Sequence, residues 1–276
     1  MSKKNKVLIT GGAGYIGSVL TPYLCNKNYD VTVIDNFSFD QHSLLDVAYK
    51  KNLKVINKDV LNKNTLRDEL KKNDIIIPLA AVVGAPSCEL NKKKAKELNV
   101  DQVKYICEIT SKEQKIIFPV TNSGYGIGEK DKFCDENSEL KPISYYGVTK
   151  VQAEKIILDR GNCITFRLAT VFGSSPRMRI DLLVNNFVYK AVNDKIIVLY
   201  ESNFKRNYIH IRDIAHTFDF AVQNFKKLKN QTYNLGLSKA NLSKKELCLK
   251  IKKHYPDLQI IETEFTNDPD KRDYIV

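Results

Sequence analysis

The amino-acid sequence predicts an α/β protein with a doubly wound parallel sheet and a smaller lobe in its C-terminal part. Three observations support this prediction. Strand-like and helix-like segments alternate from residue 6 to residue 173, which is typical of a parallel sheet covered by helices. A glycine-rich loop, TGGAGYIG at 10–17, joins the first strand to the first helix. The run DIIIPLAA at 74–81 is almost wholly apolar, as in a central strand that is buried on both faces.

The predicted elements follow one another in a regular order. We expect strands at 6–10, 29–35, 53–60, 74–81, 115–121 and 163–173. Helices are expected from about residue 15 onward, within 62–73, and at 95–113 and 144–160. Beyond Gly173 the alternation becomes irregular, and strand-like and helix-like pieces mix with longer loops. This change of rhythm predicts that the chain passes there into a second, smaller unit.

The glycine loop is the first candidate binding element. In a dinucleotide-binding βαβ unit one glycine permits the tight turn, one admits the pyrophosphate and one lets the helix pack on the strand. Gly11, Gly14 and Gly17 have the spacing for these places, with Tyr15 and Ile16 between the last two. The phosphates would then lie at the helix N-terminus, where free N–H groups and the helix dipole favour an anion. An ordinary turn is the alternative for the loop taken alone.

Asp35 selects between the two nicotinamide cofactors. It ends the second predicted strand, at the distance from the loop where an acidic residue accepts hydrogen bonds from the adenosine ribose. Its carboxylate would repel a 2′-phosphate, and the following residues, from Asn36 to Asp40, include no Lys or Arg. The sequence therefore predicts NAD rather than NADP. A carboxylate that only caps the turn after the strand is the alternative.

Composition excludes several classes of function. The six cysteines form no CxxC pair and the four histidines show no ligand spacing, so we expect reduced thiols and no metal. The net charge is +12, but the lysines alternate with Asn and Glu as on solvated helix faces, and nucleic acid is not an expected partner. No apolar run is long enough for a membrane span and no secretory h-region opens the chain. A cytoplasmic protein is expected.

Tyr146 and Lys150 form a YxxxK motif on the predicted helix 144–160. The spacing puts both side chains on one helix face. A nearby ammonium and a positively charged nicotinamide would favour the phenolate, so the pKa of Tyr146 is expected to fall from about 10 toward neutrality. Tyr146 could then accept a proton from an alcohol while hydride leaves the carbon for NAD. Tyr23 and Lys27 have the same spacing, so position in the fold must distinguish the pairs.

Taken in order, these motifs resemble the extended short-chain dehydrogenase/reductase family, whose members modify nucleotide sugars with NAD. The resemblance runs from residue 6 to the last few residues. It implies an NAD-binding Rossmann domain at 1–173 and, mainly, a nucleotide-sugar-binding lobe at 174–276 that is interwoven with it. It also implies a homodimer that pairs through the helices 95–113 and 144–160. The cofactor contacts implied beyond the glycine loop and Asp35 are Asn36, Asp59, Val60, Leu79, Ala80, Ala81, Asn99, Tyr146 and Lys150.

The resemblance also assigns substrate residues. Thr121 lies four residues before Tyr125-Gly126, where the family has a Ser or Thr that hydrogen-bonds the sugar hydroxyl. Thr121, Tyr146 and Lys150 are therefore the expected catalytic residues. RNYIHIRD and RDY are similar to family segments that bind the nucleotide diphosphate, and His210 within the first is expected to be structural. The implied substrate contacts are Val83, Ser123, Thr170, Asn185, Arg206 and Arg272.

Departures from the family pattern narrow the expected reaction. The family's 4,6-dehydratases carry an Asp-Glu pair after the strand-end Thr, whereas this chain has Asn122 and Ser123, which supply no carboxylate base. Dehydration is thus not expected, and 4-oxidation or 4-epimerisation remains. Thr170 stands where the epimerases commonly have Asn, which favours oxidation. The sequence stops at Val276, where relatives continue, so a longer natural protein is expected.

One stretch suggests a subgroup. Residues 175–188, SPRMRIDLLVNNFV, resemble the GDP-D-glycero-α-D-manno-heptose 4-dehydrogenases of bacterial capsule synthesis. The resemblance implies a GDP-sugar substrate that is oxidised at C4. A nucleotide-sugar 4-epimerase is the alternative. A hypothesis of a different functional class is a non-catalytic regulatory protein that binds NAD.

Overall fold

A seven-stranded parallel sheet forms the centre of the main lobe in the computed structural model, which describes residues 5–129, 132–263 and 272–276. Every neighbouring pair in this sheet is parallel, so the predicted fold class is confirmed. From edge to edge the sheet runs β10 (Gln231–Leu235), β6 (Cys163–Leu168), β5 (Lys115–Thr121), β4 (Ile75–Pro78), β1 (Lys6–Thr10), β2 (Asp30–Asp35) and β3 (Leu53–Asn57).

The sheet forms because its central strands bury apolar side chains on both faces. On β1, Val7 and Ile9 enter one core cluster and Leu8 enters the other. The neighbouring β4 repeats the alternation, and all of these side chains are fully buried. At about 25 cal/mol per Å² of buried apolar surface, such runs supply the main favourable term of folding.

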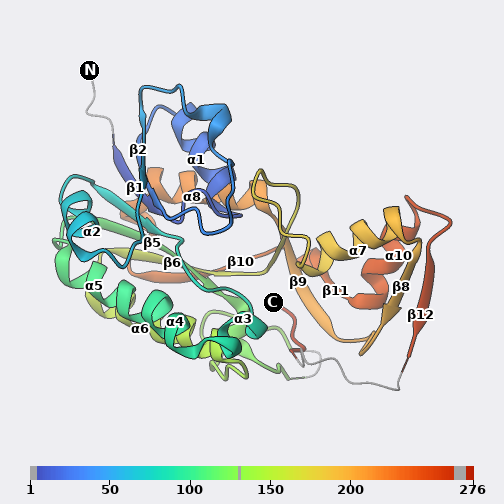
Figure 1. Cartoon of the computed structure of the whole chain (residues 1–276). Coiled ribbons are helices and arrows are strands. Elements are labelled where there is room, and N and C mark those ends of the chain that lie inside the picture. Colours follow the sequence, from blue (N-terminus) through green and yellow to red (C-terminus); the bar gives the residue numbers. More distant parts are fainter. Residues whose placement is uncertain (1–4, 130–131, 264–271) are drawn as a thin grey trace.

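Helices cover the two faces of the sheet (Figure 1). One face carries α1 (Gly17–Asn26), α8 (Ile211–Gln223) and the short α9 (Phe225–Leu228), and the other carries α2 (Lys63–Leu70), α5 (Gln102–Ile109) and α6 (Tyr145–Arg160). The Ser144 hydroxyl caps α6 by accepting from Gly147 N at 3.2 Å. The His210 ring caps α8 by accepting from Arg212 N at 3.3 Å, which is a structural use of this histidine.

Several predicted elements differ in the structure: the strand expected at 53–60 ends at Asn57, and the one expected at 74–81 ends at Pro78. The helical stretch expected at 95–113 begins earlier, because the Asn91 side chain caps α4 (Lys92–Lys96) by accepting from Lys94 N. It then passes through a π-helical turn at Glu97–Asp101 and ends with α5, where Thr110 is extended. The strand expected at 163–173 is broken at Ala169: β6 stays in the main sheet, whereas β7 (Thr170–Phe172) pairs with β9 (Lys205–His210).

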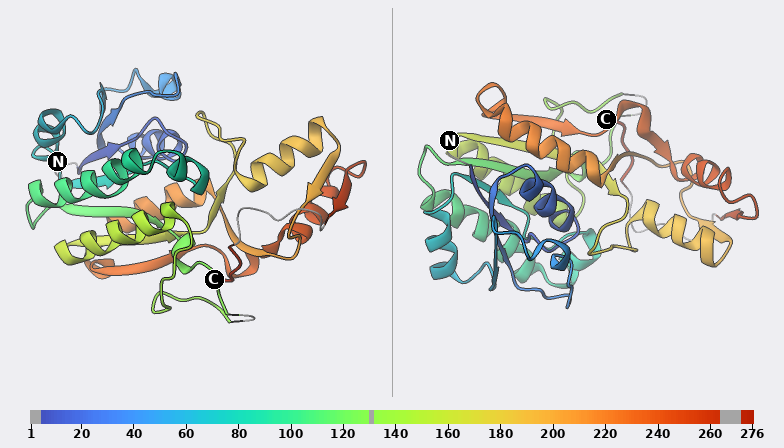
Figure 2. Two further views of the ribbon diagram at one scale, coloured as in Figure 1. Left: turned by 60° about the horizontal axis from the view of Figure 1, so that its bottom comes forward. Right: turned by 90° about the horizontal axis from the view of Figure 1, so that it is seen from above.

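The smaller lobe lies beside one end of the sheet (Figure 2). It contains two small sheets, one of β11 (Asn241–Ser243), β9 and β7, the other of β12 (Gln259–Glu262) and β8 (Ile196–Leu199). Its helices α7 (Leu183–Asn193) and α10 (Lys244–Lys252) pack on these strands around Phe187, Ile197 and Leu247. Residues 211–235 return to the main lobe as α8, α9 and β10.

The remaining elements are short. They are α3 (Ala85–Leu90) and the 3₁₀ turns Leu45–Val47, Asn122–Tyr125 and Ser238–Ala240. Within the described ranges, none of the helices has both the length and the apolar character needed to cross a bilayer. Nor do the described His, Cys, Asp and Glu side chains gather into a group of three that could hold a metal ion.

Candidate active site

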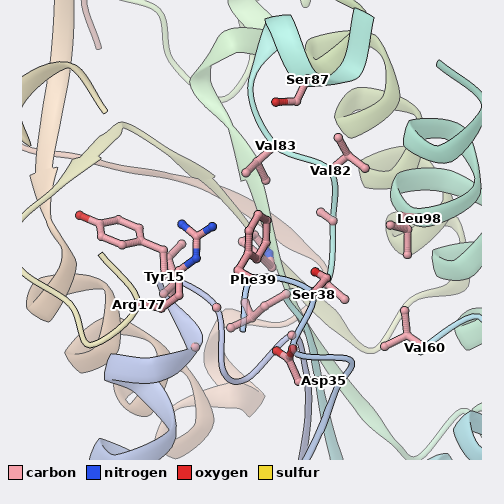
Figure 3. A pocket seen from close by; sticks show the side chains of 18 of the residues that line it. Tyr15, Asp35, Ser38, Phe39, Val60, Val82, Val83, Ser87, Leu98 and Arg177 are labelled. Carbon is pink, nitrogen blue, oxygen red and sulfur yellow. The ribbon is translucent and has the colours of Figure 1, made fainter. Parts of the chain in front are cut away.

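A cavity of about 620 Å³ opens at the carboxyl ends of the central strands, where ligands bind in doubly wound folds. Figure 3 shows Asp35, Phe39, Val83 and Arg177 around it. The predicted residues that line it are Gly11, Gly14, Tyr15, Ile16, Gly17, Asp35, Asn36, Asp59, Val60, Leu79, Ala80, Ala81, Val83, Tyr146 and Lys150. The topology thus brings together segments that are far apart in the sequence.

The glycine loop between β1 and α1 leaves no room for a side chain at Gly11 or Gly17. Gly11 has φ +71°, and a Cβ there would lie 2.7 Å from the backbone nitrogen of Ala80. A Cβ on Gly17 would lie 2.4 Å from the carbonyl oxygen of Gly11, so loop and helix touch through their backbones. The resulting bare backbone surface at a helix N-terminus suits a pyrophosphate.

Asp35, at the end of β2, is held against this loop. Its Oδ2 accepts from Ala13 N at 2.9 Å and its Oδ1 from Phe37 N at 2.9 Å. The carboxylate is nearly buried and still lines the cavity. Carboxylate oxygens have further acceptor sites, so Asp35 can also accept from ribose hydroxyls. Asp59, on the loop after β3, accepts from Leu61 N at 2.9 Å and lines the same end of the cavity.

Tyr146 and Lys150 lie one turn apart on α6 and both line the cavity. Thr121, the last residue of β5, is not among the described residues that line the cavity; its hydroxyl hydrogen-bonds with Ser123 and acts to lower the pKa of Tyr146. The Lys150 Nζ lies 4.1 Å from the centre of the Phe118 ring on β5. The other YxxxK pair lies elsewhere: the Tyr23 ring on α1 stacks on His216 of α8, with 5.0 Å between ring centres.

The expected fall in the pKa of Tyr146 is wrong for the chain by itself. Burial raises the pKa of Tyr146 to about 12. This effect outweighs the positive charges of Arg179 and Arg272 and the hydroxyl of Thr121, which act to lower the pKa. Burial also lowers the pKa of Lys150 to about 7, against the opposing influence of Glu154 and Cys88. A lysine that is half neutral near pH 7 provides less positive charge to a phenolate than a fully ionised one.

We expect Lys150→Met to raise the free energy of unfolding at about pH 6 by on the order of a few kcal/mol. The pKa of Lys150 is about 7 in the folded chain and 10.5 when unperturbed, so below pH 7 folding buries a charge. The gain is therefore full below pH 7 and disappears as the pH rises toward 10.5. Denaturant unfolding at several pH values measures it, with the exposed Lys155→Met as control. An equal gain at every pH would contradict this account.

Two predicted site residues, Asn99 and Asn185, are not among the described residues that line the cavity. They hydrogen-bond instead to segments that do line it. Asn99, in the π-helical turn, exchanges hydrogen bonds of 2.9 Å with both backbone groups of Val82 and donates to Thr149 Oγ1. Asn185, on α7, accepts from Gly173 N at 2.9 Å and donates to the Tyr15 hydroxyl at 3.1 Å. Each holds a cavity-lining segment in place, and their predicted ligand contacts remain predictions.

The other predicted substrate residues lie outside the lining of the described cavity. Ser123 follows Thr121 and accepts a hydrogen bond from Arg272 Nη1. Thr170 lies on β7 opposite Tyr208 of β9. Arg206, on β9, is buried, donates to the carbonyl oxygen of Lys205, and stacks over Tyr274 with 5.6 Å to the ring centre.

Sequence reasoning missed a pair that spans the cavity. The guanidinium of Arg177 lies 3.9 Å from the centre of the Phe39 ring, and both side chains line the cavity (Figure 3). Arg179 also lines it and forms an ion pair with Asp181. The only sequence signal for Arg177 and Phe39 was their position in the segments after Gly173 and after Asp35, since residues so far apart in the sequence are not paired by local spacing.

Comparisons with known proteins agree with this geometry. The sequence model of the NAD dependent epimerase/dehydratase family matches residues 7–236. A UDP-N-acetyl-alpha-D-glucosaminuronate decarboxylase from Bacillus cytotoxicus is 31% identical over 84% of this chain and 75% of its own length. A dTDP-D-glucose 4,6-dehydratase from Dictyostelium discoideum is 27% identical over 89% of this chain, which spans 62% of that protein.

A solved structure has the same fold. The UDP-glucuronic acid 4-epimerase of Bacillus cereus, in complex with UDP-glucuronic acid and NAD, superposes with a TM-score of 0.84. It is 23% identical, and the match covers 98% of this chain and 90% of that one. NAD is the cofactor of the matched family, and the bare glycine cradle with Asp35 beside it fits a dinucleotide.

Proposed function

We propose, since the chain belongs to the NAD-dependent epimerase/dehydratase family, that it oxidises a nucleotide-diphosphate sugar at C4. The observation that carries the proposal is the presence of Tyr146 and Lys150 in the lining of the cavity, with Thr121 at the end of β5 acting on Tyr146. A hydroxyl, a phenol and an ammonium there can bind an alcohol, take its proton and hold a ribose.

The chain's own residues would divide the work as follows. The glycine loop would hold the pyrophosphate, Asp35 the adenosine ribose, Asp59 and Val60 the adenine, and residues 79–81 the nicotinamide side. When bound, oxidised NAD supplies a positively charged acceptor for the hydride that leaves the sugar C4. Thr121 would hydrogen-bond the C4 hydroxyl, and the Tyr146 phenolate would remove its proton as C4 becomes a ketone. Lys150 would bind the nicotinamide ribose and favour the phenolate.

The neighbours of Thr121 support oxidation rather than dehydration, although the relatives include a 4,6-dehydratase. Asn122 is fully buried, and its amide has no hydrogen-bond partner among the described residues. The Ser123 hydroxyl oxygen accepts hydrogen bonds from Arg272 and from Thr121. Neither side chain supplies the carboxylate that water loss from the sugar needs.

The finer proposal is a GDP-D-glycero-α-D-manno-heptose 4-dehydrogenase of capsule synthesis, supported by the sequence of residues 175–188. This segment supplies Arg177, Arg179 and Asp181 to the cavity. A 4-epimerase is the second candidate, favoured by relatives such as the UDP-glucose 4-epimerase of Bacillus subtilis, 28% identical over 83% of this chain. Both reactions would begin with the same proton and hydride removal.

A product analysis separates the two candidates. The purified protein is incubated with UDP-, GDP- and dTDP-sugars, including the GDP-heptose, and the products are examined by NMR and mass spectrometry. We expect a 4-keto sugar, two mass units lighter, together with reduced NAD. An epimer of unchanged mass would establish the epimerase instead. No conversion of any sugar, with NAD demonstrably bound, would contradict both and favour a regulatory NAD-binding protein.

A further inference from the structure

Residues 272–276, here called the bridging segment, contact both lobes. On the main-lobe side, Gly128 N donates to the carbonyl oxygen of Asp273 and Cys134 N to that of Ile275, each at 2.8 Å. On the smaller lobe, the Asp273 carboxylate accepts from Lys205 N at 2.8 Å. The backbone that carries Arg272 is therefore fixed from two directions.

From this segment Arg272 reaches the residues next to Tyr146. Its Nη1 donates to Ser123 Oγ. Thr121 Oγ1 donates to the same oxygen at 3.0 Å and accepts from Ser123 N at 3.1 Å. The Thr121 side chain in turn acts to lower the pKa of Tyr146, which burial raises. Hydrogen bonds thus lead from the Arg272 guanidinium through Ser123 to Thr121, beside the phenol, and Thr121 and Ser123 are both buried.

We infer that Arg272 and Ser123 are positioning residues for the Thr121–Tyr146 pair. Arg272 holds the Ser123 hydroxyl, Ser123 fixes the Thr121 side chain beside Tyr146 through two hydrogen bonds with Thr121 Oγ1, and the positive charge of Arg272 favours the phenolate that removes the substrate proton. The assignment rests on the proposed function for the catalytic step. It differs from the diphosphate contact that sequence resemblance implies for Arg272, because the described hydrogen bonds lead to Ser123 and then to Thr121 at the end of β5.

Other groups also face Tyr146, and a test must distinguish their effects on its ionisation from the effect of Arg272. Arg179 acts on it from the segment before α7, but its guanidinium is bonded to the Asp181 carboxylate. The Cys88 thiol acts from α3 with the opposite sign. Lys150 follows one turn later on α6 itself. None of these contacts Ser123 in the hydrogen bonds described above, so Ser123→Ala breaks the Arg272 route and leaves the other groups in place.

The test measures the ionisation of position 146 without requiring turnover. 3,5-Difluorotyrosine, a more acidic phenol than tyrosine, is placed at position 146, and its ¹⁹F resonance is titrated in the NAD-loaded protein. We expect Arg272→Met and Ser123→Ala each to raise the midpoint, Arg272→Met by about one pH unit, and Arg272→Lys to raise it less. The exposed Arg212→Met, on α8, is the control and should leave it unchanged.

Turnover provides the second readout, in the wild-type tyrosine background. For a positioning role, Arg272→Met lowers kcat about tenfold at a fixed pH below the midpoint and shifts the kcat profile to higher pH. A higher KM for the nucleotide sugar, with an unchanged ¹⁹F midpoint in both variants, would overturn the inference and restore the diphosphate role. Should no sugar be converted, the titration still decides the inference independently. Circular dichroism shows whether Arg272→Met folds, and Ser123→Ala provides the test if it does not.

Discussion

Tyr146→Phe is expected to lower kcat for sugar oxidation by about 10²–10⁴-fold, while NAD affinity stays within about threefold of wild type. The phenol oxygen is the proposed acceptor of the substrate proton, and Tyr146 lines the cavity. Phenylalanine fills the same space and removes only that oxygen. Steady-state formation of reduced NAD gives kcat, and quenching of protein fluorescence on NAD addition gives the affinity.

Tyr23→Phe is the matched control for this prediction. Tyr23 has the same spacing to a lysine on a helix, but its ring stacks on His216 of α8 and does not line the described cavity. Turnover should be unchanged in that variant. Full activity of Tyr146→Phe would remove the proposed base, whereas equal losses in both variants would point to a general effect on folding.

The second large effect concerns stability. Arg167→Met is expected to lower the free energy of unfolding by about 3–5 kcal/mol, because it leaves a charge buried without its partner. Arg167 Nε of β6 lies 3.1 Å from Glu154 Oε1 of α6, and the two side chains are 8% and 3% exposed. Arg167 Nη1 also donates to the Tyr125 hydroxyl at 3.0 Å, so the network joins β6, α6 and the turn after β5.

A second substitution identifies the cause of the loss. Adding Glu154→Gln to Arg167→Met removes the buried charge and should recover part of the lost stability, which denaturant unfolding of the single and double variants measures. Because burial lowers the pKa of Lys150 and the Glu154 charge acts to raise it, removal of that charge should leave Lys150 less protonated and turnover in the double variant below that of the wild type. If the double variant is as unstable as the sum of the two single ones, the pair contributes through packing and not through charge.

Local patterns in the sequence predicted the main cofactor-binding and catalytic residues of the candidate site. The glycine loop, Asp35 and the Tyr146–Lys150 spacing each depend on residues within one strand–loop–helix unit or one helix turn, and the sheet topology then places them at one cavity. The strand breaks and helix starts were less predictable, because a cap such as Asn91 or a single residue such as Ala169 decides them.

What the sequence did not predict depends on tertiary contacts. Arg177 and Phe39 meet across the cavity although they belong to distant segments, and Arg272 reaches Ser123 from the bridging segment. The pKa of Tyr146 also depends on how deeply the folded chain buries it, and burial outweighs the charges that the motif suggested. None of these follows from spacing along the chain.

The way in which the chain passes between the lobes limits their relative motion. It crosses at Ala169 between β6 and β7, directly from β9 into α8 at His210, and between β10 and the 3₁₀ turn at Ser238. Ala169 N donates to the carbonyl oxygen of Leu235 at 2.9 Å, which ties the first crossing to the third. Because these three crossings within the described residues are short, no flexible linker joins the lobes at them. Any closure over the cavity therefore has to be a small twist that is distributed over several strands, and not a swing about a single hinge.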